Sequence, residues 1–256
     1  MSREIIDAIT ALHRKRNFAM EQRKRANLAL GAFLRLALGW RKDLPDLERK
    51  RIANQADEWM ETGEGPFIDI LAASDLARAP YEKIEKDCLR EMERLAKQLP
   101  IWAAFGEPVR GFGAASLAVI VAEAGDLSIY ATEAKLWKRM GLAVIDGKRQ
   151  GGLPKNAGAE AWIEHGYSPL RRSRMWNIGD ALIKGNRDGK YRTSYLARKE
   201  IELQRNPEMS KMHTHRRAQR YMEKRLLRDL WRAWRRISVG VAERPRAAKS
   251  SRGIDR

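Results

Sequence analysis

Residues Val109–Ala118 have the sequence VRGFGAASLA, and this stretch is the strongest indication of the fold. It matches the pattern of a helix-hairpin-helix motif, in which an apolar residue stands between two glycines and a helix of small side chains follows. Glycine adopts positive φ angles easily and has no side chain to block close approach. We therefore expect a tight turn with positive φ at Gly111 and Gly113, with Phe112 pointing inward to hold two helices together.

The helix that follows this hairpin is expected to bind a phosphate oxygen at its amino end. The first amides of a helix have no acceptor within the helix, and they carry the positive end of its dipole. Arg110 stands beside the loop and can add an ionic contact. Such a site contacts the backbone of a nucleic acid rather than its bases. The predicted site comprises Arg110, Gly111, Phe112, Gly113 and Ala114, and a plain interhelical turn is the alternative interpretation.

The rest of the chain has the apolar spacing of helices, so the predicted fold class is mainly α. We expect a short helix at 67–76 that ends before Pro80, a long one at 81–99, and a final helix at 213–237. Only Leu142–Ile145 resembles a strand. The predicted organisation is a helical arm, coiled-coil-like region or bundle at 1–99, a helix-hairpin-helix DNA-binding domain at 100–145, a glycine-rich loop at 146–158, basic helices at 159–239 and a disordered basic tail at 240–256.

The charge of the chain points to a polyanionic partner. The 256 residues include 51 basic and 33 acidic ones, a net charge of +18, and residues 211–256 alone hold 15 basic and 4 acidic ones, a net +11. A surplus of this size attracts nucleic acid. A solvated helix face and a solubilising tail remain the alternatives. The basic residues predicted to contact phosphates lie in two helices and are Arg171, Arg172, Arg174, Arg216, Arg217, Arg220 and Lys224.

No catalytic, metal or cofactor site is indicated by the remaining residues. Cys88 lies on an apolar stripe and is predicted to be a core thiol, and Asp126 is predicted to cap a turn. His213 and His215 have no third ligand beside them, so no metal is expected. We expect no cofactor, no signal peptide and no membrane partner, and we expect a cytoplasmic, nucleoid-associated protein.

Three blocks of sequence resemble the C-terminal domain of the one-ten family of insertion-sequence transposases, which includes the one-sixteen and nine-oh-two groups. The blocks are Arg110–Gly113, Ala122–Asp126 and Lys135–Leu142, and in that family they read P-G-apolar-G, A-E-I-G-D and a capped helix ending in G-L. The resemblance is specific over about residues 100–150 and continues more weakly through 167–184. Stand-alone proteins similar at 213–217 and 220–231 are often labelled transposases.

Two departures from that family bear on activity. The family's transposases carry a RuvC-like domain of strands with a metal-binding carboxylate set, whereas residues 1–100 have a helical pattern. The family also has a nucleophilic serine in an R-Q-S-G-like context, where this chain has Arg149–Gly152 with Gly151 in place of the serine. Glycine cannot form a phosphodiester, so the resemblance implies DNA binding without independent cleavage and leaves the enzymatic status open.

The favoured function is therefore a DNA-binding protein of a mobile element, acting in transposition or recombination through phosphate contacts. One alternative is an active transposase with an unidentified nucleophile or a partner nuclease. Another is a non-enzymatic RNA-binding or assembly protein, which keeps structured RNA open as a partner beside DNA. A homo-oligomer through the N-terminal helices is a further partner that the sequence allows, because alternating charges on helices favour coiled-coil pairing.

Overall fold

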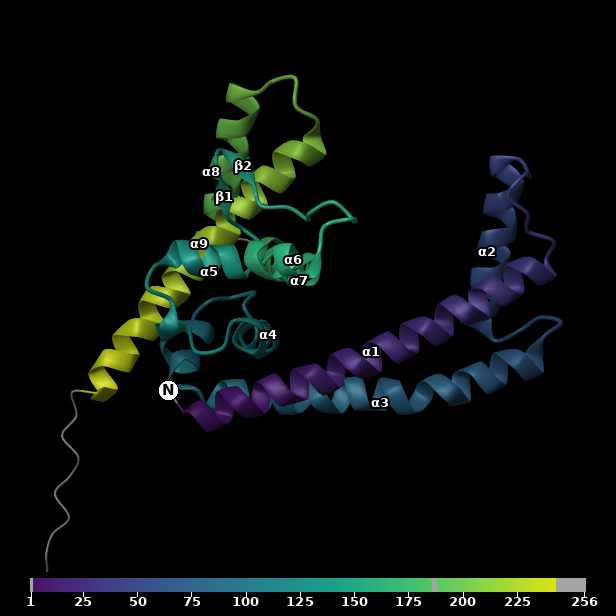
Figure 1. Ribbon diagram of the computed structural model, residues 1–256, viewed down its shortest axis with the longest axis horizontal. Coiled ribbons are helices and arrows are strands. Elements are labelled where there is room, and N and C mark those ends of the chain that lie inside the picture. Colours follow the sequence, from purple (N-terminus) through teal and green to yellow (C-terminus); the bar gives the residue numbers. More distant parts are fainter. Residues whose placement is uncertain (1, 186–187, 243–256) are drawn as a thin grey trace, which may run out of the picture. The chain divides into compact units, whose positions relative to one another are not determined.

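The computed structural model describes residues 2–185 and 188–242, and over these residues the protein is mainly α-helical, as predicted (Figure 1). Its elements in chain order are α1 (Arg3–Ala37), α2 (Asp46–Thr62), α3 (Ile68–Gln98), the π-helical turn η1 (Trp102–Gly106), α4 (Ala114–Ala124), the 3₁₀ turn η2 (Leu127–Ile129), α5 (Glu133–Arg139), β1 (Val144–Ile145), β2 (Lys148–Arg149), α6 (Ala159–His165), α7 (Pro169–Gly185), α8 (Lys190–Arg205) and α9 (Lys211–Ala242).

The chain forms two compact units, which we call the arm, residues 11–91, and the C-terminal unit, residues 2–10 together with 92–242. The predicted arm at 1–99 has different limits. Ile6 and Ile9 at the start of α1, and Leu95 and Leu99 near the end of α3, are buried side chains of the C-terminal unit. Burial of these side chains, which local sequence does not reveal, sets the boundary.

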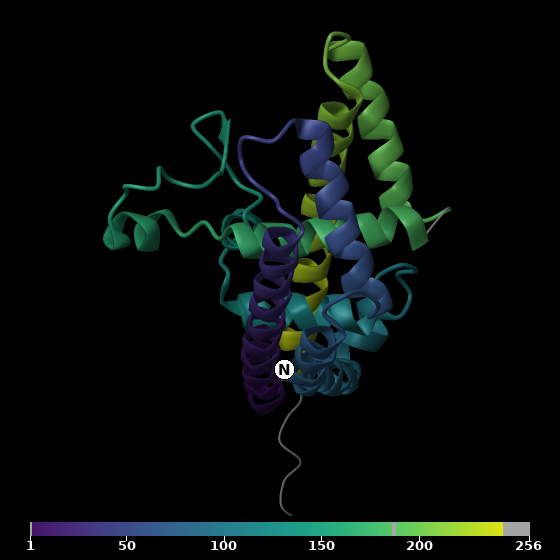
Figure 2. The ribbon, with the colours of Figure 1, turned by 90° about the vertical axis from the view of Figure 1, so that its right-hand side faces the viewer.

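Within the arm, α1 and α3 run antiparallel and side by side (Figures 1 and 2). Arg23 Nε donates to Glu85 Oε1 over 2.7 Å, and Arg78 Nη1 donates to Asn27 Oδ1 over 2.6 Å. At the end of the arm that contains α2, an apolar cluster joins α2 to α1 and α3. The buried members of that cluster are Leu30, Leu34, Ala56 and Leu71. The predicted core position of Cys88 is confirmed, because its side chain is buried.

The predicted break before Pro80 is wrong, because α3 continues through this residue. Proline removes one helical hydrogen bond and crowds the carbonyl four residues earlier, here that of Leu76. Both Pro80 and Leu76 are exposed, so the freed carbonyl can bond to water instead. The apolar positions before and after Pro80 therefore belong to one helix, which lacks one backbone hydrogen bond at the proline.

The helix α9 is the central element of the C-terminal unit, and α5, α7, α8 and both short turns pack against it (Figure 2). The apolar spacing of its sequence predicts a buried stripe, and six residues of that stripe are buried: Met222, Leu226, Leu227, Leu230, Trp231 and Trp234. Tyr221, the seventh residue of this stripe, is 37% exposed. The helix also runs past its predicted end to Ala242, so residues 240–242 are helical rather than part of a tail, and 243–256 lie outside the described residues.

The strand predicted at 142–145 is confined to β1, which pairs with β2 in a two-stranded antiparallel hairpin. Asp146 and Gly147 form its turn with φ angles of 49° and 73°. Two positive φ angles match the twist of a tight hairpin, and Asp-Gly is a preferred sequence for this turn. The predicted loop at 146–158 therefore begins with a hairpin that places Arg149 at a defined position.

Candidate nucleic-acid interface

The glycine hairpin has the predicted turn at Gly111 and the predicted inward side chain at Phe112. Gly111 has φ = +85°, and the Phe112 amide donates to the Val109 carbonyl over 2.9 Å. Phe112 is 2% exposed and meets Phe105 of η1 edge to face, with ring centroids 5.8 Å apart. The turn is thus held in place by a buried aromatic pair.

Gly113 differs from the prediction, because its φ is −70° and its ψ is 165°. This is extended backbone that any residue can adopt. Gly113 is the N-cap of α4, and its carbonyl accepts from the Ser116 and Leu117 amides. A side chain at Gly113 would meet no atom within 4 Å. The amino end of α4 is therefore open at this residue, and no positive φ is needed to keep it open.

The residues on either side of the two glycines determine which groups the hairpin exposes to solvent. Arg110 is exposed, whereas Ala114 is buried and contributes to the surface only through its backbone amide. A Cβ atom at Gly185, the last residue of α7, would lie 3.2 Å from the Cα of Gly111. The close approach of these two glycines fixes the hairpin against the end of α7.

We expect Gly111→Ala to lower the free energy of unfolding by about 1–2 kcal/mol, because a Cβ is strained at φ = +85°. Gly113→Asn is expected to be neutral or slightly stabilising, since its φ is ordinary and asparagine is a good N-cap. Urea unfolding of both variants followed by circular dichroism measures the difference. Equal losses of stability in the two variants would contradict this assignment of the turn.

The three arginines predicted on α7 are engaged inside the protein rather than exposed in a row. Arg171 Nε lies 3.3 Å from Glu123 Oε2, and Arg174 pairs with the same carboxylate. Arg172 Nη1 lies 2.8 Å from Glu223 Oε2. These arginine side chains are 14–18% exposed. They join α7 to α4 and α9, so these three side chains face other helices and do not form an outer contact surface.

The predicted basic residues of α9 fall into two groups. Arg216, Arg220 and Lys224 follow one another at intervals of four residues and so lie along one side of the helix. Arg217 lies elsewhere, with its Nε 2.8 Å from Oε2 of the buried Glu202. Arg216 is exposed, whereas Arg220 and Lys224 are half-buried. The line of three, which we call the basic row, is the part of the prediction that the structure brings together.

A residue absent from the sequence prediction, Arg149 of β2, acts on the charge of Arg220 in the basic row. Burial lowers the pKa of Arg220, and the positive charges of Arg172 and Arg149 lower it further. Burial and then the charge of Arg220 lower the pKa of Lys224. The Asp146–Gly147 dipeptide could have revealed the hairpin that carries Arg149. The sequence could not reveal that the charge of Arg149 acts on Arg220.

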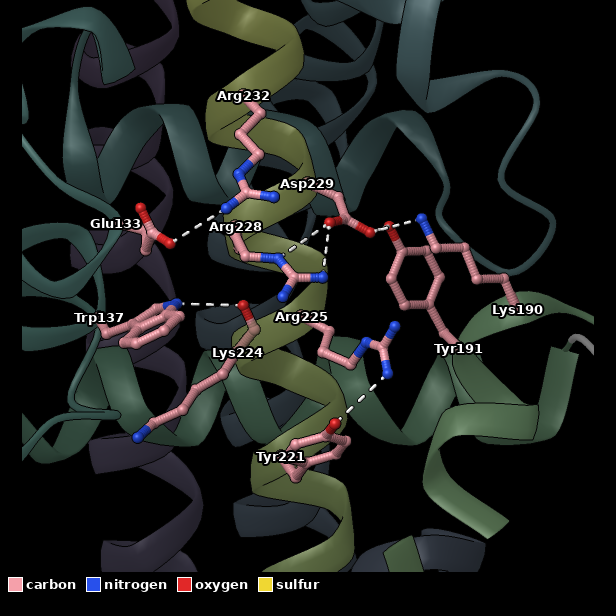
Figure 3. A network of polar contacts seen from close by, with 10 residues as sticks. All are labelled: Glu133, Trp137, Lys190, Tyr191, Tyr221, Lys224, Arg225, Arg228, Asp229 and Arg232. Atoms are coloured by element: carbon pink, nitrogen blue, oxygen red, sulfur yellow. Dashed lines mark hydrogen bonds and ion pairs between the residues drawn. The ribbon is translucent and has the colours of Figure 1, made fainter. Parts of the chain in front are cut away.

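Arg225, Arg228 and Arg232 of α9 take part in contacts within the protein, which Figure 3 shows. Asp229 accepts from Lys190 Nζ over 2.6 Å and from the Tyr191 hydroxyl over 3.2 Å, and it also pairs with Arg228. Burial raises the pKa of the Asp229 carboxyl, but its bonds to Lys190 and Arg228 bring it below its ordinary value. In the same network Arg232 pairs with Glu133 at 3.5 Å, and the Arg225 Nη1 lies 3.3 Å from the Tyr221 hydroxyl (Figure 3). These contacts are structural.

Asp126 and His215 both take part in hydrogen bonds within the protein. Asp126 accepts from the Ser128 amide over 2.9 Å and from the Trp234 Nε1 over 2.8 Å, which confirms its role as a cap. His215 Nδ1 lies 2.8 Å from the Tyr195 hydroxyl. Among residues 2–185 and 188–242, no group of three or more His, Cys, Asp or Glu side chains could hold a metal ion.

Gly151 takes part in a small contact with α6. The Gly151 carbonyl lies 2.6 Å from His165 Nε2. A side chain at Gly151 would meet no atom within 4 Å.

The three tryptophans at 137, 162 and 176 are half-buried or exposed rather than fully buried in the core. Trp137 packs on the side of α9, where its Nε1 donates to the Lys224 carbonyl over 3.0 Å.

A scan against protein-family models and searches of the curated proteins and of the solved structures match nothing to this chain. No helix in the described part of the chain is both long enough and apolar enough to cross a bilayer.

Proposed function

We propose that this protein binds DNA for a mobile element, as a transposase-like component of transposition or recombination. The observation that carries the proposal is the open amino end of α4 at Gly113, beside the exposed Arg110. A helix of 11 residues begins there, and no side chain caps it with a hydrogen bond. Amides at the positive end of a helix, next to a guanidinium, favour a phosphate oxygen.

The basic row adds a second set of phosphate contacts. Arg216 is exposed, and within the described residues no carboxylate pairs with it. The charge surplus of the last 46 residues raises the local concentration of any polyanion. Contacts of this kind engage the backbone without reading the sequence, and they release counterions, so the affinity should fall steeply as salt is added.

The mobile-element part of the proposal comes from the resemblance to the one-ten family. Because glycine occupies position 151, the proposal is binding and not cleavage by this chain alone. Nucleoid association, and self-association through the N-terminal helices, belong to the same proposal. The exposed apolar residues Phe18, Leu28 and Leu36 of α1 give the helices a surface for self-association.

The sharpest test is Gly113→Asp, which puts a carboxylate at the proposed phosphate position while leaving the backbone unstrained. Aspartate is a good N-cap, so stability should be kept or improved. We expect the affinity for a 30-base-pair duplex, measured by fluorescence anisotropy at about 100 mM salt, to fall at least tenfold, since a charge repels the phosphate where amides had bound it.

Gly158→Asp is a matched control. Gly158 is the N-cap of α6, with φ = −65° and ψ = 162°, and its Cβ would also meet no atom within 4 Å. Both variants change the net charge equally, and Gly113→Asn supplies the cap without the charge. Loss of affinity in Gly113→Asp alone supports the hairpin as a phosphate site. Equal affinities in both aspartate variants would exclude it.

The same titration distinguishes the competing functions. Tighter binding of structured RNA than of duplex DNA would favour the RNA-binding alternative. Cleavage of DNA by the purified chain would favour an active transposase whose nucleophile lies elsewhere. Absence of any salt-dependent binding to either polymer would overturn the proposal as a whole.

A further inference from the structure

We propose that Arg198, Tyr221 and Arg225 together hold a backbone phosphate of the nucleic acid, at a site between α8 and α9. This inference rests on the proposed function and names a second place where the nucleic acid is held. We call these three residues the α8–α9 site. Arg198 belongs to α8, whereas Tyr221 and Arg225 stand about one helical turn apart on α9. None of the three belongs to the contact residues that the sequence predicts.

The Tyr221 ring brings two guanidinium groups together. The Cζ atom of Arg198 lies 5.2 Å from the ring centroid, and that of Arg225 lies 5.7 Å from it. Arg225 Nη1 also donates to the Tyr221 hydroxyl over 3.3 Å (Figure 3). Cations at such distances are attracted to the electron-rich face of an aromatic ring. Side chains that are already ordered lose less conformational entropy when a ligand binds, so this arrangement is preorganised.

The carboxylates of the protein do not cancel the positive charge of the α8–α9 site. Glu202 is buried and serves two arginines at once, since its Oε1 accepts from Arg198 Nε over 2.8 Å and its Oε2 lies 2.8 Å from Arg217 Nε. Within the described residues no carboxylate pairs with Arg225. Asp229, one turn further along α9, is already paired with two other cations. Three guanidinium groups thus share one carboxylate, which leaves a net positive charge for an anion to neutralise.

The α8–α9 site has donors that a ligand can reach. Tyr221 is exposed, the Arg198 side chain is 28% exposed, and Arg225 is half-buried. Arg225 uses Nη1 for the contact with Tyr221, and among the described residues its Nη2 has no hydrogen-bond partner. The Tyr221 hydroxyl accepts from Arg225 and can still donate its own proton. The contacts that order the site therefore leave guanidinium and hydroxyl donors for the oxygens of a phosphate.

The α8–α9 site adjoins the basic row on the surface of α9. Tyr221 and Arg225 each follow a member of that row, Arg220 and Lys224, by one residue. This offset places them about 100° further round the helix. Phosphates of one nucleic acid can therefore contact both sets of donors, and the α8–α9 site extends the contact surface toward α8.

Arg225→Gln tests the α8–α9 site, with Arg236→Gln as its matched control. Arg236 is an exposed arginine of the same helix, and its Nε donates to the Arg232 carbonyl over 3.4 Å. We expect Arg225→Gln to weaken duplex binding about tenfold and to reduce the slope of log affinity against log salt by about 1. Arg236→Gln, which removes the same charge outside the site, should change both quantities much less.

Tyr221→Phe separates a direct contact from a general effect of charge. The variant keeps the ring that orders both arginines and loses only the hydroxyl. We expect binding about fivefold weaker at an unchanged salt slope, because a hydrogen bond to a charged group is lost but no cation is removed. Urea unfolding should give a stability close to that of the wild type, since Tyr221 is exposed. If Arg225→Gln lowers the stability of the fold, Tyr221→Phe decides the matter.

The outcomes separate this inference from the proposed function. If Arg225→Gln and Arg236→Gln lose affinity equally, or if Tyr221→Phe binds as the wild type does, the α8–α9 site is excluded. A defect in Gly113→Asp would still support the hairpin in that case. If Arg225→Gln alone reduces the slope and Tyr221→Phe weakens binding without changing it, the site is supported. If the wild-type chain shows no salt-dependent binding at all, the proposed function and the α8–α9 site are both overturned.

Discussion

Replacing Trp234 with alanine should lower the free energy of unfolding by about 3–5 kcal/mol, the range for truncating a buried large aromatic side chain. The Trp234 side chain is fully buried on α9, and its Nε1 donates to Asp126 Oδ1 over 2.8 Å. Asp126 caps η2 by accepting from the Ser128 amide. The substitution therefore opens a cavity and removes one hydrogen bond from a carboxylate that positions the chain after α4.

Circular dichroism during urea unfolding measures this effect without relying on tryptophan fluorescence. Trp234→Phe keeps most of the ring but loses the N–H donor, so its loss should be smaller, about 1.5–3 kcal/mol. Trp176→Ala is the control, because Trp176 is 40% exposed and its loss should be about 1 kcal/mol. A Trp234→Ala variant no less stable than Trp176→Ala would show that α9 does not anchor this part of the C-terminal unit.

As the pH rises from 4.5 to about 7, the protein should lose about 3 kcal/mol of stability through Glu223 alone. Burial raises the pKa of this carboxyl from 4.5 to about 7, against the opposing charges of Arg172 and Arg220. In this window the unfolded chain releases the proton and the folded chain keeps it. The folded state therefore binds more protons, so its stability falls as the pH increases and levels off above about 7.

Urea unfolding at several pH values between 5 and 8 tests this for the wild type and for Glu223→Gln. The variant keeps the shape of the side chain but cannot ionise, so its stability should vary less across the window. Glu160→Gln, at an exposed residue of α6, is the control and should follow the wild type. Asp126 and Asp229 have lowered pKa values, so their stabilisation is lost only as the pH falls below about 4. Parallel curves for Glu223→Gln and wild type would rule out this role for Glu223.

Local sequence was sufficient for features that depend on short-range geometry. The cap of α5 is an example, because Thr132 accepts from the Lys135 amide and Gly141 has φ = +73° after the helix. The limits of α8 follow from local signals as well, since Gly189 precedes it and Asn206–Pro207 follows it. The buried stripe of α9 followed from its apolar spacing.

Sequence was insufficient where a side chain's role depends on its partner. Arg171, Arg172 and Arg174 have the same local pattern as a phosphate-binding row, but their partners Glu123 and Glu223 come from distant elements. Local sequence predicts a break at Pro80, because proline removes a helical hydrogen bond. It does not reveal that α1 packs along α3, where the helix continues. Gly113 was assigned a positive φ by its similarity to Gly111.

The sequence by itself determined that this protein is built of helices, that a tight turn lies at Gly111, and that its C-terminal part carries a large positive charge. These properties follow from spacing, from backbone conformations open to glycine, and from composition, all of which are local or additive. The tertiary structure alone decided which arginines are matched by carboxylates and which are not. That difference arises because charges interact through space, and only the packing of α4, α7 and α9 sets the distances between them.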